Sequence, residues 1–165
     1  MLARVAVFLD YCSIEAASQS KGIVVDYGKL LEYLANKSVG RGLAYAVTHL
    51  MHESSGEQER LEETTKRLYD DGYIVKIVSG DSEQSIRSRL TYEVVMDLVR
   101  IACVHEPDVI VIASDQVENS RWVVEYLKRE TRTLVEIASF SDVYLEGCAN
   151  RIDLGVAGIL KAGKT

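Results

Sequence analysis

Short, unbroken apolar runs recur along this chain, and they restrict its fold more than any other feature of the sequence. Val109-Ile110-Val111-Ile112-Ala113 is the most apolar run, and Arg4-Val5-Ala6-Val7-Phe8-Leu9 is the first. Unbroken runs are typical of strands buried on both faces, as in parallel sheets. Segments with helical spacing separate the runs, which is the pattern of βαβ units. The sequence therefore predicts an α/β fold, a three-layer sandwich with a mainly parallel central sheet.

The expected strands and helices alternate from one end of the chain to the other. Asp26 has the position of a helix N-cap, and Pro107 marks the break after the longest helix. A polar connection is expected at residues 18–21, and a short helix is expected to begin within 141–145. The predicted strands cover residues 4–9, 43–49, 73–78, 109–113 and 133–138, and the predicted helices follow Asp26 and cover 57–71, 86–105 and 119–130.

The composition is that of one ordinary globular domain. Of the 165 residues, 47% are apolar and 27% are charged, which allows one sizeable core. We expect a single domain over residues 1–154 and a flexible tail over 155–165, which is rich in Gly, Ala and Lys. No apolar run is long enough to span a membrane, and no cleavable export signal is visible.

Cysteine usage and charge narrow the class of protein further. Cys12, Cys103 and Cys148 are far apart and odd in number, which predicts free thiols in a reducing, cytoplasmic compartment rather than a zinc site or disulfide framework. The net charge of −6 argues against strong non-specific binding of nucleic acid over the whole surface. A local binding site remains compatible with that charge.

Two aspartates follow apolar runs directly. Asp10 comes after the first predicted strand and Asp115 follows the fourth. Functional groups gather at the carboxyl ends of strands in open α/β sheets, so neighbouring strands would bring both carboxylates to one crevice. Two carboxylates are suitable ligands for Mg²⁺ or Mn²⁺, which can activate water for attack at phosphorus. The alternative is that each aspartate only stabilises a turn.

Other polar residues could complete such a site. Glu93 on the long helix and Glu118 after the fourth strand are candidate third carboxylates. The alternatives are that Glu93 and Asp97 share a solvated helix face, and that Glu118 favours the positive end of the next helix. Ser13 and Ser114 stand beside the two aspartates and could hold water or a phosphate oxygen, or cap a turn. A metal-ligand role is not favoured for His49 or His52, because neither has a partner at metal-binding spacing.

The order of these segments resembles that of NYN domains, a branch of the PIN-like nuclease superfamily that includes the LabA-like proteins. The resemblance implies a PIN-like, Rossmann-like sheet and a divalent-metal-dependent ribonuclease that acts on RNA phosphodiester bonds. It implies Mg²⁺ or Mn²⁺ as the cofactor and Asp10 and Asp115 as metal ligands and catalytic residues. The matching segments are Val5-Ala6-Val7-Phe8-Leu9-Asp10, Val25-Asp26-Tyr27-Gly28, Val109-Ile110-Val111-Ile112-Ala113-Ser114-Asp115 and Cys148-Ala149-Asn150-Arg151-Ile152-Asp153-Leu154.

Three positions depart from the family pattern. Ser13 replaces an asparagine, Thr91 replaces the aspartate of a turn at the long helix, and Val117 replaces the second aspartate after the fourth strand. Ser13, Ser114 and Thr91 are then candidate substrate-binding residues. Two hypotheses remain open: a ribonuclease whose metal shell Glu93 or Glu118 completes, or a catalytically impaired module that binds RNA or protein, in one version as a homodimer. A small-molecule site in the same crevice ranks below these two.

Overall fold

The fold is a parallel sheet between two layers of helices. The computed structural model describes residues 2–35, 40–53, 57–142, 145–155 and 159. Six strands form one sheet in the order β3-β2-β1-β4-β5-β6, and every pair of neighbours is parallel. The predicted α/β sandwich is therefore confirmed. The strands are β1 (Ala3–Leu9), β2 (Arg41–Glu53), β3 (Ile74–Gly80), β4 (Val109–Ala113), β5 (Leu134–Ser139) and β6 (Asn150–Asp153).

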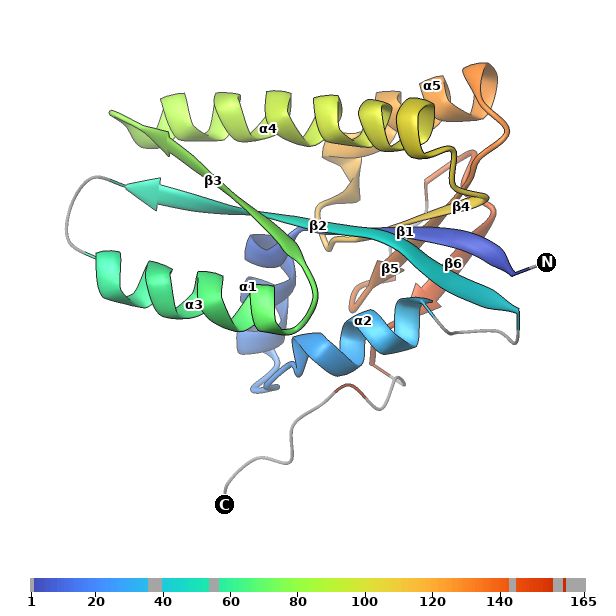
Figure 1. The fold of residues 1–165 in the computed structure, drawn as a ribbon. Helices are drawn as coiled ribbons and strands as arrows, with labels where there is room; N and C mark the ends of the chain where they lie inside the picture. Colours follow the sequence, from blue (N-terminus) through green and yellow to red (C-terminus); the bar gives the residue numbers. More distant parts are fainter. Residues whose placement is uncertain (1, 36–39, 54–56, 143–144, 156–158, 160–165) are drawn as a thin grey trace.

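Helices cover both faces of the sheet (Figure 1). On one face lie α1 (Tyr11–Ser20), α2 (Tyr27–Ala35) and α3 (Gln58–Asp70), and on the other lie α4 (Glu83–Arg100) and α5 (Arg121–Glu130). A separate apolar cluster fills each interface. All five residues of β4 are buried, as expected for a central strand with helices on both sides.

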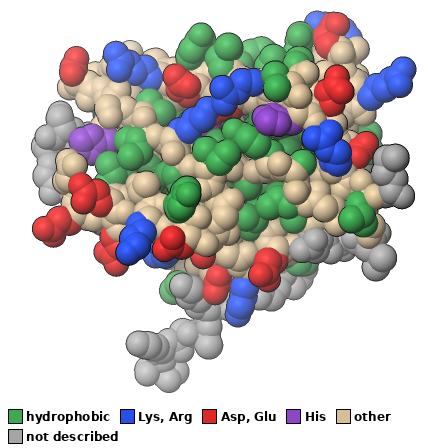
Figure 2. Space-filling model, in the orientation of Figure 1, with side chains coloured by type: hydrophobic (Ala, Val, Ile, Leu, Met, Phe, Trp, Pro, Cys, Tyr) green, Lys and Arg blue, Asp and Glu red, His purple; other side chains and the backbone are tan. Residues whose placement is uncertain are grey.

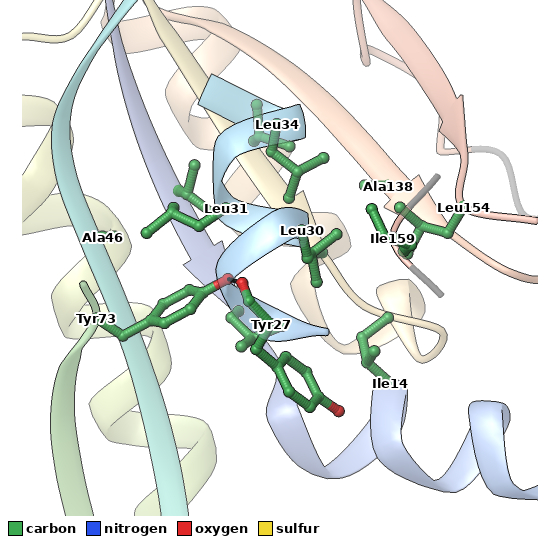
Figure 3. Close-up of a cluster of buried hydrophobic side chains, with 14 of the residues drawn as sticks. Ile14, Tyr27, Leu30, Leu31, Leu34, Ala46, Tyr73, Ala138, Leu154 and Ile159 are labelled. Carbon is green, nitrogen blue, oxygen red and sulfur yellow. Dashed lines mark hydrogen bonds between the residues drawn. The ribbon is translucent and has the colours of Figure 1, made fainter. Parts of the chain in front are cut away.

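The apolar cluster beneath α1 and α2 holds these two helices against the sheet. Leu30, Leu31 and Leu34 of α2 point into it, and Ile14 of α1 reaches it from the side (Figure 3). The Tyr73 hydroxyl donates a 3.0 Å hydrogen bond to the backbone carbonyl of Tyr27. This buried contact ties the start of α2 to the start of β3.

The strand order places a crevice between β1 and β4. The chain runs from β1 outward to β2 and β3, and then returns to the other side of β1 as β4. The connections that follow β1 and β4 therefore leave in opposite directions. The crevice where such connections diverge is the usual position of a binding site in open α/β sheets. The backbone N–H of Asp10 donates to the carbonyl of Ala113 at 2.9 Å, so the two strand ends are directly linked.

Several elements differ from the sequence prediction. Helix α1 occupies most of the segment expected to be irregular, because its buried face carries Ser13 and Ser18 as well as Ile14 and so lacks an apolar stripe. Strand β2 is longer than predicted, β6 adds an edge strand, and α4 begins earlier at its Ser82 cap. The long helix ends in a wider turn, η1 (Ile101–His105).

Two predictions concern the last part of the chain. The short helix expected within 141–145 is not seen at the described residues there, and residues 143–144 lie outside the described part. Most of the expected tail, residues 156–158 and 160–165, also lies outside it. Ile159 is buried, and its carbonyl accepts the backbone N–H of Asp26 at 2.8 Å, so at this residue the expected flexible tail is instead packed on the core.

In the ranges that the structure describes, no helix has the length and apolar character needed to cross a bilayer.

Candidate functional site

A pocket of about 380 Å³ lies at the carboxyl ends of β1 and β4. Its lining comes from the end of β1 and the residues just after it, from β2, from the residues that follow β4, from α4 and from the short 3₁₀ turn η2 (Val117–Ser120). Four residues proposed from the sequence line it: Asp10, Ser13, Thr91 and Ser114. The crevice expected from the strand order is therefore present, and it contains one of the two aspartates.

Two serines hold the Asp10 side chain in place. Asp10 caps α1, and its Oδ1 accepts the Ser13 backbone N–H at 3.2 Å. The Ser114 hydroxyl donates to Oδ2 at 2.7 Å, and the two serine hydroxyls are 3.1 Å apart. Ser13 Oγ also accepts the backbone N–H of Asp115 at 3.1 Å. This network fixes the carboxylate at the mouth of the β1–β4 crevice.

The carboxylate of Asp115 forms hydrogen bonds with the segment that follows β5. Its Oδ1 accepts the backbone N–H groups of Phe140 and Ser141 at 2.7 and 3.3 Å. Its Oδ2 accepts the Ser141 hydroxyl at 2.9 Å. Asp115 is not among the residues that line the pocket. Its side chain therefore stabilises the turn after β5, which corresponds to the structural alternative considered for this residue.

The candidate third carboxylates also lie elsewhere. Glu93 lines a separate hollow with Lys76 and Arg89, and Glu118 forms an exposed bidentate ion pair with Arg121 at 2.9 Å. Val117, at the position of the missing family aspartate, is completely buried. The structure therefore does not bring Glu93 or Glu118 to Asp10.

The donor set does not fit a preformed site for a divalent cation. Of the pocket-lining residues in the described part of the chain, only Asp10 is acidic, and both of its oxygens already accept hydrogen bonds. Within the described ranges, no three His, Cys, Asp or Glu side chains gather closely enough to hold a metal. Mg²⁺ is usually bound through one or two carboxylates together with substrate phosphates. A single carboxylate whose oxygens already accept hydrogen bonds would therefore bind Mg²⁺ weakly.

A buried charged cluster beneath the pocket was missed from the sequence. Asp97 on α4 is only 3% exposed, so the expectation that it lies on a solvated helix face is wrong. It contacts Nε2 of His49 at 2.8 Å, the ammonium group of Lys76, and the guanidinium of Arg100 at 3.1 Å. A sequence signal existed, because Asp97 is three residues after Val94 on the helix and thus shares its apolar face.

This cluster keeps Asp97 ionised. Burial acts to raise the pKa of its carboxyl, but the contacts with His49 and Lys76 outweigh burial and hold the pKa below its ordinary value. Asp97 therefore carries its negative charge at neutral pH. His49 itself lines the pocket, as do Arg87, Gln116 and Asn119, none of which the sequence patterns had indicated as site residues.

Comparison with known proteins identifies the architecture. A family model described as the NYN domain matches residues 4–152. A crystal structure of a protein of unknown function from Vibrio parahaemolyticus superposes with a TM-score of 0.74 at 12% identity, covering 97% of this chain and 97% of that chain. At such low identity the likeness concerns the fold alone. No curated protein matches the sequence.

Proposed function

This chain belongs to the NYN domain family, within the PIN-like nuclease superfamily, and we propose that it binds RNA in the β1–β4 pocket without metal-assisted cleavage. RNA is the substrate class that the family membership favours. The absence of cleavage is inferred from the residues that replace the family's acidic set. The proposal is therefore the second of the two hypotheses drawn from the sequence, a catalytically impaired module.

One observation carries the proposal: among the described residues that line the pocket, Asp10 alone has a carboxylate. A buried valine, Val117, stands at the position of a second one. The Asp115 oxygens accept hydrogen bonds from Phe140 and Ser141. Metal-assisted hydrolysis needs a cation held where it can polarise phosphate or water. The carboxylates described here provide too few ligands in the pocket to hold such a cation.

The pocket has the mixed character that nucleotide binding requires. Its lining combines apolar side chains of α4 with the guanidinium of Arg87 and the amides of Gln116 and Asn119. Ligand sites commonly pair apolar walls with a few polar groups that fix orientation. Basic and acidic side chains are interspersed over the face seen in Figure 2. With a net charge of −6, binding would therefore depend on pocket contacts more than on a basic surface, and its salt dependence would be shallow.

The competing function is the divalent-metal-dependent ribonuclease predicted from the family. The position of Asp10 favours it, since the resemblance of the sequence to NYN domains implies a first metal ligand at the end of the first strand, where Asp10 lies. In that case Asp10 would act with substrate phosphates, and Asp115, Glu93 or Glu118 would have to move to join it. RNA binding that depends strictly on Mg²⁺ or Mn²⁺ would favour this function over the proposed one.

Fluorescence anisotropy with a labelled single-stranded RNA of about ten nucleotides, in the presence of EDTA, tests the proposal. We expect saturable binding that Arg87→Gln weakens roughly fivefold to tenfold, or about 1 to 1.4 kcal/mol. Arg121→Gln is the matched control, because each arginine pairs with a glutamate three or four residues earlier and, of the two, Arg87 lines the pocket. No binding by the wild-type chain, or equal loss in both variants, would contradict the proposal.

The homodimer and the cytoplasmic location remain predictions from the sequence. Sedimentation velocity on the purified chain measures the first directly. A sedimentation coefficient that does not change with protein concentration and corresponds to the 18.4 kDa monomer would contradict the homodimer.

A further inference from the structure

His49 lies at the inner end of the pocket, on β2. It is only 3% exposed and lines the pocket. Its ring packs against Phe8 of the neighbouring strand, with ring centroids 5.5 Å apart. Alternation along the strand puts Met51 on the same face, nearer the pocket mouth, and Met51 also lines the pocket. His49 is thus a polar residue in a position that normally belongs to the apolar core.

One ring nitrogen of His49 has a charged neighbour and the other has none. Nε2 lies 2.8 Å from Oδ2 of Asp97. Because Asp97 is ionised, the ring proton is favoured on Nε2, where the carboxylate stabilises it. Both ring nitrogens are buried, and among the described residues neither has a partner in hydrogen-bonding geometry, so the approach of Nε2 to Asp97 is an ion-pair contact and Nδ1 has no contact of that kind. In a neutral ring with this tautomer, Nδ1 is an unused acceptor.

An unused buried acceptor costs free energy. Such a group has given up its hydrogen bonds to water without gaining a partner, and unsatisfied groups of this kind are uncommon in native proteins. The surrounding structure holds His49 firmly all the same, through Phe8 and Asp97. A ligand that donates a hydrogen bond to Nδ1 would remove the cost.

We propose that the pocket takes a single unstacked nucleobase, with an N–H group of the base donating to Nδ1 of His49. This inference rests on the proposed RNA binding and names the part of the RNA that the pocket holds. Met51, which also lines the pocket, is unbranched and adaptable, so its side chain can repack around a base. Asp97 is then a positioning residue, which fixes the tautomer and orientation of the histidine.

The chemistry of the pocket favours a base over a phosphate group. Asp10 repels a phosphate, whereas it can accept hydrogen bonds from a base or a ribose hydroxyl. Leu90 and Val94 of α4 give the lining an apolar surface suited to the face of a base. A volume of about 380 Å³ is at the small end of ordinary ligand sites, which span roughly 300–1,000 Å³, and so suits one nucleoside rather than a stacked pair.

Two titrations of the full chain separate this inference from the proposed function. The first uses free adenosine, cytidine and guanosine, with ribose 5-phosphate as the probe that lacks a base. The second uses a single-stranded RNA and the same RNA with every base removed. We expect the nucleosides to bind, ribose 5-phosphate to bind at least tenfold more weakly, and the abasic strand to lose most of the affinity.

Variants at position 49 test the hydrogen bond itself. We expect His49→Phe, which keeps a ring against Phe8, to weaken nucleoside binding at least tenfold, and His49→Gln, whose amide oxygen can accept, to recover part of it. His105→Phe is the control, since His105 stacks on Tyr45 and does not line the pocket. Should His49→Phe fail to fold, nitrogen NMR of the wild-type histidines serves instead, and the Nδ1 signal of His49 should shift when nucleoside is added.

Each outcome has a separate meaning. If RNA binds but the abasic strand binds equally well, or the His49 signal does not move, the base-pocket inference is overturned and RNA binding stands. If nucleosides bind through His49 but RNA does not, the proposed function is overturned and the pocket is a nucleoside site. If neither ligand binds, both proposals fail.

Discussion

The Ser114 hydroxyl donates a 2.7 Å hydrogen bond to Oδ2 of Asp10 and thereby joins the ends of β4 and β1. Ser114 Oγ also accepts the backbone N–H of Gln116 at 3.0 Å, so one hydroxyl fixes both the carboxylate and the start of the next turn. The geometry of the pocket mouth depends on this residue. A hydroxyl used in this way has little freedom to act as a nucleophile.

Removing the Ser114 hydroxyl tests this role. We expect Ser114→Ala to lower the free energy of unfolding by about 1–3 kcal/mol, because it leaves the part-buried carboxylate of Asp10 and the backbone N–H of Gln116 without their partner. RNA affinity should fall as well, because the Asp10 side chain and the turn at Gln116 lose their anchor. Urea denaturation and anisotropy measure the two effects. Ser20→Ala, which removes an exposed hydroxyl on α1, should change neither by much.

The ion pair between Arg41 and Glu136 supplies a test of the fold away from the pocket. Two hydrogen bonds of 2.9 and 2.8 Å join these side chains, which are only 16% and 7% exposed. Removing one partner from a buried pair is strongly destabilising, so we expect Arg41→Met to cost about 3 kcal/mol. Arg129→Met, which breaks a largely exposed pair with Glu130, should cost less than about 1 kcal/mol. Equal urea midpoints for the two variants would contradict the prediction.

The charged cluster around Asp97 should make stability depend on pH. Its folded-state pKa lies below the ordinary value of 3.8, so its contribution is fully present above that value and is lost as pH falls through the lowered pKa. We expect Asp97→Asn to be less stable at neutral pH and to lose less further stability between pH 5 and pH 3 than the wild-type chain. Urea midpoints across that range measure it. The exposed Asp81→Asn should follow the wild-type curve.

The three cysteines should react at different rates. Burial, and after it the charge of Asp10, raises the pKa of the Cys12 thiol, and burial raises the pKa of Cys148 to about 11. Both thiols therefore stay largely protonated and unreactive in mildly alkaline buffer. We expect iodoacetamide to modify the exposed Cys103 first, as followed by peptide mass spectrometry. Because Cys12 lines the pocket, saturating RNA should slow it further while leaving Cys103 unchanged.

Hydrophobic patterning was sufficient to predict the core of this fold. The runs that became β1 and β4 are buried on both faces, so their sequence carries an unmistakable strand signal. Helix α1 gave no such signal, because small polar residues such as Ser13 and Ser18 occupy its buried face. Strand β6 is short and lies at the edge of the sheet. Fewer of its side chains have to be apolar there, so its sequence pattern is weak.

The location of the site could be predicted from the sequence, but not all of the residues that form it. Strand order identified the crevice and Asp10 within it, whereas the direction of the Asp115 side chain depends on backbone N–H groups of Phe140 and Ser141, far away in sequence. His49 and Asp97 are also distant in sequence and meet only when α4 packs on β2. Contacts of this kind cannot be read from the spacing of residues along the chain.

The most direct test of the account follows one end-labelled RNA by fluorescence anisotropy over several hours, with wild-type chain and saturating Mn²⁺. Binding without cleavage predicts an immediate rise to a plateau that EDTA leaves unchanged and that stays constant over time, both for the wild-type chain and for Asp10→Asn at a saturating concentration. A signal that decays toward the value of short fragments, in a manner abolished by EDTA and by Asp10→Asn, would contradict it and establish a metal-dependent ribonuclease.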